Sequence, residues 1–157
     1  TTAAFVKVTT GTAIKTMLQV KLGRAVLLGK VVEWGISFDG SAAATPIACE
    51  LLTTNTVAAT VTAAVATGII NLDPEHIAPT DLDPFDFGTA ATGFTASAEG
   101  TITATRMMDL QLVAPTNQYI KQWPLGREPL FNQSDFLRIR VTAGAAVNAY
   151  CYVIVEV

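Results

Sequence analysis

Hydrophobic and polar residues alternate along much of this chain, which is the pattern of a β-strand with one buried face. In residues 13–22, Ile, Thr, Leu and Val occupy one side, while Lys, Met and Gln occupy the other. This segment therefore predicts a half-buried strand. Residues 135–142 alternate in the same way, which predicts that their aliphatic side chains face inward and that Arg138 and Arg140 face outward.

Further strands are predicted for residues 25–38, 46–53, 100–113, 118–123 and 147–157. The last of these is apolar on both faces, which is typical of a strand central in a sandwich or covered by another subunit. Gly29 and Gly35 lie inside residues 25–38, where glycine favours a bulge or a tight bend. Residues 55–68 leave two interpretations open, since their Ala content permits a short helix while Thr and Val favour a strand or irregular structure.

Residues 71–88 interrupt this pattern. The segment contains three prolines and five acidic residues, a composition that excludes a central strand. It therefore predicts a long surface loop, and loops of this length often form contacts.

The order of these elements predicts an all-β fold. About eight strands, separated by turn signals and without regular strand–helix alternation, indicate an antiparallel two-sheet sandwich. A jelly roll is the expected topology. An immunoglobulin-like sandwich is the alternative, although Trp34 precedes both Cys49 and Cys151 and so breaks the Cys-Trp-Cys order of true immunoglobulin domains. We expect residues 1–157 to form a single domain.

Composition narrows the classes of function. Charged residues make up 15% of the chain, against roughly 25% in typical soluble domains, so we expect a partner to cover part of the surface. A formal net charge of −3 argues against nucleic-acid binding, which needs clustered Lys and Arg. Polar residues interrupt every hydrophobic segment, so no membrane span is predicted. The first residues lack the pattern of a signal peptide, so we expect either no Sec export or earlier processing.

The chain offers little for catalysis or for metal binding. Its one His, His76, is far in sequence from both cysteines, so neither a catalytic triad nor a zinc site is predicted. Cys49 and Cys151 lie in apolar runs and are interpreted as small buried hydrophobes, with a disulfide as the alternative. Carboxylates in the 71–88 loop lack the spacing of a calcium site, so we expect them to face solvent or a basic neighbour. We therefore expect no enzyme activity, cofactor or metal.

A second segment is rich in residues that mark protein contacts. Residues 113–131 contain Tyr119, Trp123, Arg127 and Phe131 together with three prolines. Aromatic residues and Arg are enriched at binding hot spots. Two interpretations stay open: a strand with a proline-fixed corner where Trp123 closes the core, or an interface.

Three stretches resemble proteins of one known group. They are TTGTAIKTMLQV (residues 9–20), VVEWGISFDGSAAATPIACELL (residues 31–52) and QLVAPTNQYIKQWPLGREP (residues 111–129). Together they are similar to the decoration, or cement, proteins of tailed bacteriophages. The resemblance implies a structural virion protein with a β-sandwich or jelly-roll fold, made in the host cytoplasm and bound to the outer surface of the capsid. It further implies a homotrimer whose partner is the major capsid protein.

On this resemblance, two candidate interfaces are expected. The first contains Tyr119, Trp123, Arg127 and Phe131 and would pack against sister subunits or the capsid. The second contains Asp81, Asp83 and Asp86 and would meet a basic capsid patch or solvent.

Two alternatives come from other classes. A carbohydrate-binding or host-adhesion module of a virion could use Tyr119 with Asn117 and Gln118. A small enzyme would need two facing carboxylates about 5 to 10 Å apart in a cleft.

Overall fold

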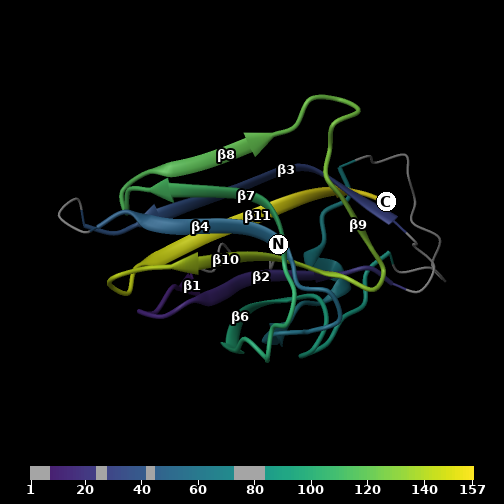
Figure 1. Ribbon diagram of the computed structural model, residues 1–157, viewed down its shortest axis with the longest axis horizontal. Coiled ribbons are helices and arrows are strands. Elements are labelled where there is room, and N and C mark those ends of the chain that lie inside the picture. The colour runs from purple at the N-terminus through teal and green to yellow at the C-terminus, as the bar shows by residue number, and fades with distance from the viewer. Residues whose placement is uncertain (1–7, 24–27, 42–44, 73–83) are drawn as a thin grey trace.

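The computed structural model describes residues 8–23, 28–41, 45–72 and 84–157, which form two antiparallel β-sheets packed face to face (Figure 1). Sheet A has the order β1 (Val8–Thr9), β11 (Asn148–Glu156), β3 (Leu28–Asp39) and β8 (Gln118–Gln122), and β9 (Leu130–Asn132) also pairs with β3. Sheet B has the order β5 (Thr60–Ala63), β6 (Gly93–Ala98), β2 (Lys15–Lys21), β10 (Phe136–Thr142), β4 (Ile47–Thr53) and β7 (Arg106–Val113). The predicted all-β, antiparallel two-sheet sandwich is confirmed.

The strands pair in a nested order that is typical of a jelly roll. The pair β2·β10 encloses β3·β8, which encloses β4·β7, which encloses β5·β6, and each pair is antiparallel. A long hairpin that folds over on itself produces this nesting. One feature departs from a regular jelly roll: β5 and β6 extend sheet B beside β2, while β11 extends sheet A beside β3.

The core lies between the sheets. Trp34 and Ile36 of β3 face Leu137 and Ile139 of β10 across it, and all four side chains are buried. The inward orientation predicted for the aliphatic residues of 135–142 is therefore confirmed. Strand β11 pairs with β3 along its length, whereas β1 pairs with its other side only at Asn148 and Ala149. Its residues from Tyr150 to Val155 are partly buried, so among the described residues β11 is central in the sheet only at its start.

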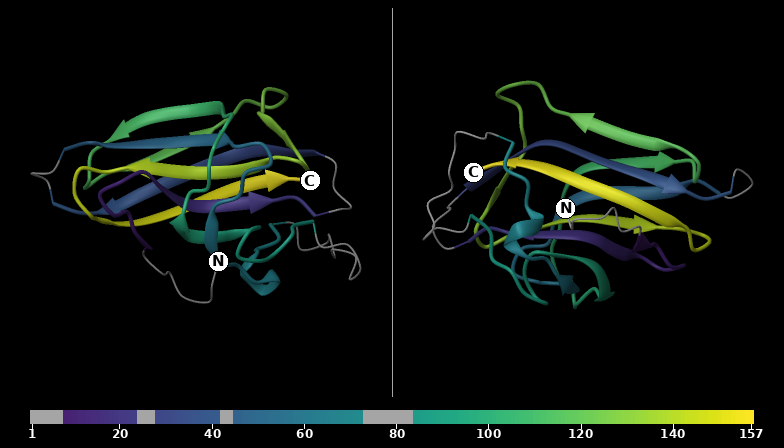
Figure 2. Two further views of the ribbon diagram at one scale, coloured as in Figure 1. Left: turned by 60° about the horizontal axis from the view of Figure 1, so that its bottom comes forward. Right: turned by 180° about the vertical axis from the view of Figure 1, so that it is seen from behind.

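Strand β2 differs from its prediction. The predicted alternation, which puts Met17 and Gln19 on one face, is wrong: the register of β2 against β10 shifts at Met17, so Met17 joins Val20 in the core while Gln19 faces outward. The predicted half-burial is also wrong, because Thr16 and Gln19 on the outer face are as fully buried as Met17 on the inner face. The cause is the position of the β5·β6 pair. Because β4 lies two strands beyond β2, residues 54–59 must cross the outer face of sheet B to reach β5, and residues 99–105 must cross back to reach β7 (Figure 2).

The two glycines of β3 serve close packing and do not mark bulges. The register shift of β3 against β11 falls at Val32, between Glu33 and Val31. A Cβ atom on Gly35 would lie 2.5 Å from the ring of Tyr152. Gly35 therefore leaves room for Tyr152 to lie across the outer face of sheet A, where its hydroxyl donates to Glu33.

Some segments differ from the predicted elements. The strand predicted for residues 100–113 begins only at Arg106, as β7, because residues 99–105 form a crossing connection. Residues 55–68 contain both alternatives, because β5 is followed by a short 3-10 helix, η1 (Ala66–Gly68). The sequence pattern does not predict strands β1, β6 and β9. Of the loop predicted at 71–88, residues 73–83 lie outside the described part, and residues 84–88 form only isolated bridges.

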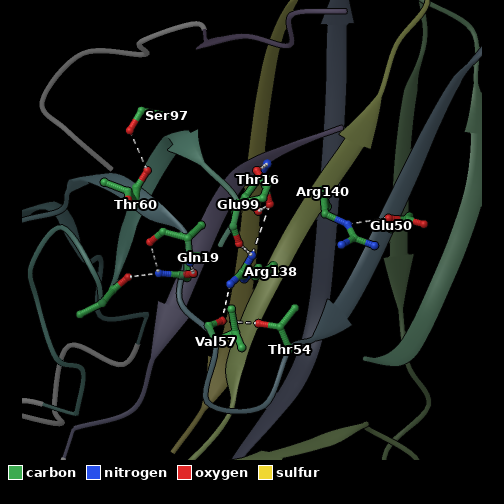
Figure 3. Close-up of polar contacts among 12 residues, drawn as sticks. Thr16, Gln19, Glu50, Thr54, Val57, Thr60, Ser97, Glu99, Arg138 and Arg140 are labelled. Atoms are coloured by element: carbon green, nitrogen blue, oxygen red, sulfur yellow. Dashed lines mark hydrogen bonds and ion pairs between the residues drawn. The ribbon is translucent and has the colours of Figure 1, made fainter. Parts of the chain in front are cut away.

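The two crossing connections bury an arginine. Arg138 faces away from the core, as predicted, but its side chain is fully buried rather than exposed. Its guanidinium donates to the carbonyl of Val57 in the first connection and to Glu99 in the second, where Nη1 lies 3.3 Å from Oε2 (Figure 3). Glu99 in turn accepts from the hydroxyl of Thr16 at 2.6 Å. These contacts fix both connections to the sheet.

Gln19 completes this polar layer. Its side-chain amide donates to the carbonyl of Ala91 at 2.7 Å and accepts from the N–H of Ala59 at 2.8 Å. Burial costs a polar group free energy unless hydrogen bonds replace its water, so these bonds hold residues 54–59 against β2.

We predict that Glu99→Gln destabilises the fold by about 3–5 kcal/mol, because it leaves the buried charge of Arg138 without its counterion. Glu156→Gln is the matched control, since it breaks the exposed Lys30–Glu156 pair and should cost less than about 1 kcal/mol. Urea unfolding measures both free energies. Equal, small losses for the two variants would contradict a stabilising role for the Arg138–Glu99 pair.

Candidate interaction surface

Strands β8 and β9 are two parts of one edge strand interrupted by a loop. Both pair with β3: Gln122 is opposite Glu33, and Leu130 is opposite Lys30. Only Val31 and Val32 of β3 lie between these two pairs, so residues 123–129 must leave the sheet edge and then return to it. We call residues 123–129 the projecting loop (Figure 1).

The base of the projecting loop is closed by backbone hydrogen bonds. The Trp123 N–H donates to the carbonyl of Val32 at 3.1 Å, and the Val31 N–H donates to the carbonyl of Pro129 at 3.0 Å. Because both bonds go to β3, the loop has a fixed origin on the sheet.

The tip of the projecting loop is a tight turn. The Arg127 N–H donates to the carbonyl of Pro124 at 2.9 Å, and Gly126 has a φ of 81°. A positive φ at the third residue is the requirement of a type II turn, which glycine meets without strain. The turn holds Leu125 outward with 95% of its surface exposed. An ordered turn that presents a leucine to solvent has the properties of a preformed contact.

The residues predicted in the 113–131 segment separate in the structure. Arg127 is exposed on the projecting loop, while Trp123 and Tyr119 are partly buried and pack against the core. Phe131 is 1% exposed and belongs to the core itself. The segment thus closes the core and also presents a surface, and Leu125 is its most exposed large hydrophobic side chain.

The acidic candidates are only partly described. Asp86 is exposed, and its N–H donates to the carbonyl of Lys21 at 3.0 Å. Asp81 and Asp83, like His76, lie outside the described residues.

Tyr119 takes part in a polar contact that joins the two sheets. Its hydroxyl donates to Oδ2 of Asp109 at 2.8 Å, and the indole N–H of Trp34 donates to the same oxygen at 3.1 Å. The two rings meet edge to face, 5.4 Å apart. Burial, together with the hydrogen bond to Asp109 and its charge, raises the pKa of Tyr119 to about 12.

Strand β7 presents a second exposed apolar surface. Met107, Leu110 and Leu112 are 45%, 52% and 73% exposed on the outer face of this edge strand, and we call them the β7 face. A register shift against β4 leaves Met108 as an extra residue. This bulge places Met107 and Leu110, three residues apart, on the same face.

Charged groups border the β7 face. Leu110 is opposite Glu50 of β4, which accepts from Arg140 at 2.8 Å. Arg106 begins β7, and its guanidinium donates to the carbonyl of Leu130 next to the projecting loop. The β7 face and the projecting loop are thus joined through Arg106. Strict alternation along residues 100–113 would not reveal this surface, because the bulge and the edge position depend on pairing with β4.

A depression at the polar end of the sandwich is a poor match for a sugar-binding site. Ser37, Thr116, Asn117 and Gln118 line a shallow depression of about 500 Å³ together with Phe38. Tyr119 points instead to Asp109, and Phe38 is buried. The depression therefore lacks the exposed aromatic ring that the carbohydrate-binding alternative places beside Asn117 and Gln118.

Both cysteines are free thiols, Cys49 buried and Cys151 partly buried. Burial raises the pKa of each thiol to about 12, which makes both poor nucleophiles near neutral pH. The described residues contain no group of three or more His, Cys, Asp or Glu that could hold a metal ion. Within the same residues, no helix is long and apolar enough to cross a membrane.

No protein-family profile, curated protein sequence or solved structure matches this chain.

We predict that Tyr119 contributes to a loss of stability at high pH. Its pKa is about 12 in the folded chain against an ordinary value of 10, so folding favours the protonated phenol. The contribution is complete below pH 10 and is lost as the pH rises from 10 to 12. Urea unfolding across this range should show a steeper fall for the wild type than for Tyr119→Phe, and parallel curves would contradict the prediction.

Proposed function

We propose that this chain is a capsid decoration (cement) protein, a structural virion protein that binds the outer surface of a phage head. In this role it contacts the major capsid protein and stabilises the contacts between adjacent capsid subunits. The proposal requires binding surfaces and no reaction centre.

The observation that carries the proposal is the β7 face. Three large apolar side chains in a row on an edge strand promote uncontrolled association unless a partner covers them. Their exposure in the single chain is therefore expected of a protein that functions in an assembly. The β7 face is the surface that we assign to the capsid.

The resemblance to decoration proteins supports the proposed function. The similar stretches include most of β2, β3 and β4, and the segment from the end of β7 through the projecting loop. They therefore contribute to both sheets, and of the β7 face they include Leu112.

Binding would stabilise the head by linkage. A protein that binds only the assembled shell shifts the equilibrium towards assembly, by an amount set by its concentration relative to the dissociation constant. Because β7 is paired with β4 from Arg106 to Val113, the backbone that carries the β7 face is ordered before binding, which reduces the conformational entropy lost on binding.

The test is co-sedimentation with heads of the phage that encodes this chain, stripped of accessory proteins. Wild type should bind saturably and raise the melting temperature of the heads. Leu110→Ser should weaken binding about 5- to 30-fold, the effect of losing about 1–2 kcal/mol of apolar burial.

Ile120→Ser is the matched control, because Ile120 lies on the outer face of sheet A and is as exposed as Leu110, at 52%. Its affinity for heads should equal that of the wild type. If Ile120→Ser weakens binding and Leu110→Ser does not, the β7 face is the wrong surface. If the wild type shows no saturable binding, the proposed function itself is wrong.

A further inference from the structure

Strand β11 has a long edge that β1 covers only at its start. The two residues of β1 pair with the first two of β11, Val8 with Ala149 and Thr9 with Asn148. Among the described residues, no strand pairs with the same side of β11 from Cys151 to Val155. A strand edge left open in this way is a template for pairing with a further strand.

The backbone groups of every second residue of β11 face this edge. The Thr10 N–H donates to the carbonyl of Val147 at 2.9 Å on the same side of the strand. Because backbone hydrogen-bonding groups point alternately to one neighbour and to the other along a strand, those of Cys151, Val153 and Val155 also point to this side. They offer donors and acceptors in the spacing that an antiparallel strand requires.

The side chains beside the open edge are incompletely covered. Cys151, Val153 and Val155 pack against the core, but they are only partly buried. Ala149, which points to the same side and is the residue that β1 covers, is 2% exposed. A strand laid along residues 151–155 would therefore remove further apolar surface from water.

The residues that precede β1 have a sequence that fits this edge. Residues 2–7 read TAAFVK and lie outside the described part of the chain. Continuing the register of β1 would place Val6 opposite Cys151 and Ala4 opposite Val153. Val8 packs against the core, and residues two apart share one face of a strand, so this register would put Val6 and Ala4 on the core side.

We propose that residues 2–7 continue β1 along the open edge of β11 in the same molecule. The two pairs between β1 and β11 set the register. A slip of one residue would turn Lys7 to the core side, where its charge would lose water. The proposed register instead puts Phe5 opposite Tyr152 on the outer face, as an aromatic cross-strand pair.

Continuity favours the chain's own residues over a strand from another molecule. Residue 7 is bonded directly to Val8, which is already paired with β11, so the pairing loses no translational or rotational freedom of a second molecule. The added strand makes β11 central along its length, which accounts for the apolar character of both its faces. The proposal does not rest on the proposed function, since it uses neither the β7 face nor a capsid.

Nuclear magnetic resonance of the full chain tests the pairing directly. Residues opposite each other in a non-hydrogen-bonded antiparallel pair have Cα atoms about 4.5 Å apart, so a nuclear Overhauser effect should connect the α-protons of Phe5 and Tyr152. The amide protons of Cys151 and Val153 should exchange slowly with solvent, because each would be hydrogen-bonded. Absence of the Phe5–Tyr152 effect, or fast exchange of both amides, overturns the proposal.

Two proline variants test the register. Val6→Pro removes an N–H that would point to β11, whereas Lys7→Pro removes one that would point away from it, where an edge strand tolerates proline. Exchange of the Cys151 amide should accelerate about 10- to 100-fold in Val6→Pro, the effect of losing a pair of hydrogen bonds. It should stay near the wild-type rate in Lys7→Pro. Equal acceleration in both variants, or none in Val6→Pro, contradicts the register.

A sample mixed from ¹³C-labelled and unlabelled chains identifies the molecule that supplies the strand. The effect between Phe5 and Tyr152 should appear within labelled chains and be absent from spectra that select contacts between labelled and unlabelled chains. Its appearance in those spectra would show that a second copy supplies the strand, which overturns the proposal. None of these measurements involves a capsid, so their outcome is independent of the proposed function.

Discussion

The passage of two connections across the outer face of sheet B is the constraint on which the rest of this structure depends. It follows from the position of the β5·β6 pair beside β2. Because β4 and β7 lie on the other side of sheet B, the chain must cross the sheet from β4 to β5 and again from β6 to β7. The outer-face residues Thr16 and Gln19 of β2 and Arg138 of β10 are buried, whereas Met107, Leu110 and Leu112 on the outer face of β7 are exposed. The same topology therefore accounts for the buried charge of Arg138 and for the exposure of the β7 face.

The exposed surfaces belong to distinct structural units. The β7 face belongs to sheet B, the projecting loop interrupts the edge of sheet A, and a third group of exposed apolar side chains follows β5: Val65, Ile69, Ile70 and Leu72. A chain with 15% charged residues and separate apolar surfaces is suited to contact several neighbours at once. This arrangement fits a subunit of an assembly better than a protein that binds one small ligand.

The fold was predictable from local pattern, whereas the surfaces were not. Alternation in residues 135–142 identified the inward side chains, because the sandwich buries one face of β10 in its core. Burial of Arg138 depends on Val57 and Glu99, which no local pattern connects to it. Phe131 illustrates the same limit: aromatic residues mark interfaces and cores alike, and only its place in β9 assigns it to the core. The exposure of Leu125 has no sequence signal, because an isolated leucine between Pro and Gly has no periodicity.

Because the base of the projecting loop is closed, the sequence of the loop can change without affecting the fold of the sandwich. Because Trp123 and Pro129 bond to neighbouring residues of β3, the sheet registers on either side do not depend on the length or composition of the chain between them. Insertions, deletions and substitutions at the tip would change the surface that the loop presents without changing how the sandwich folds. The edge of sheet A is therefore a position where chain length and composition can vary, and where a foreign peptide can be displayed on an otherwise unchanged scaffold.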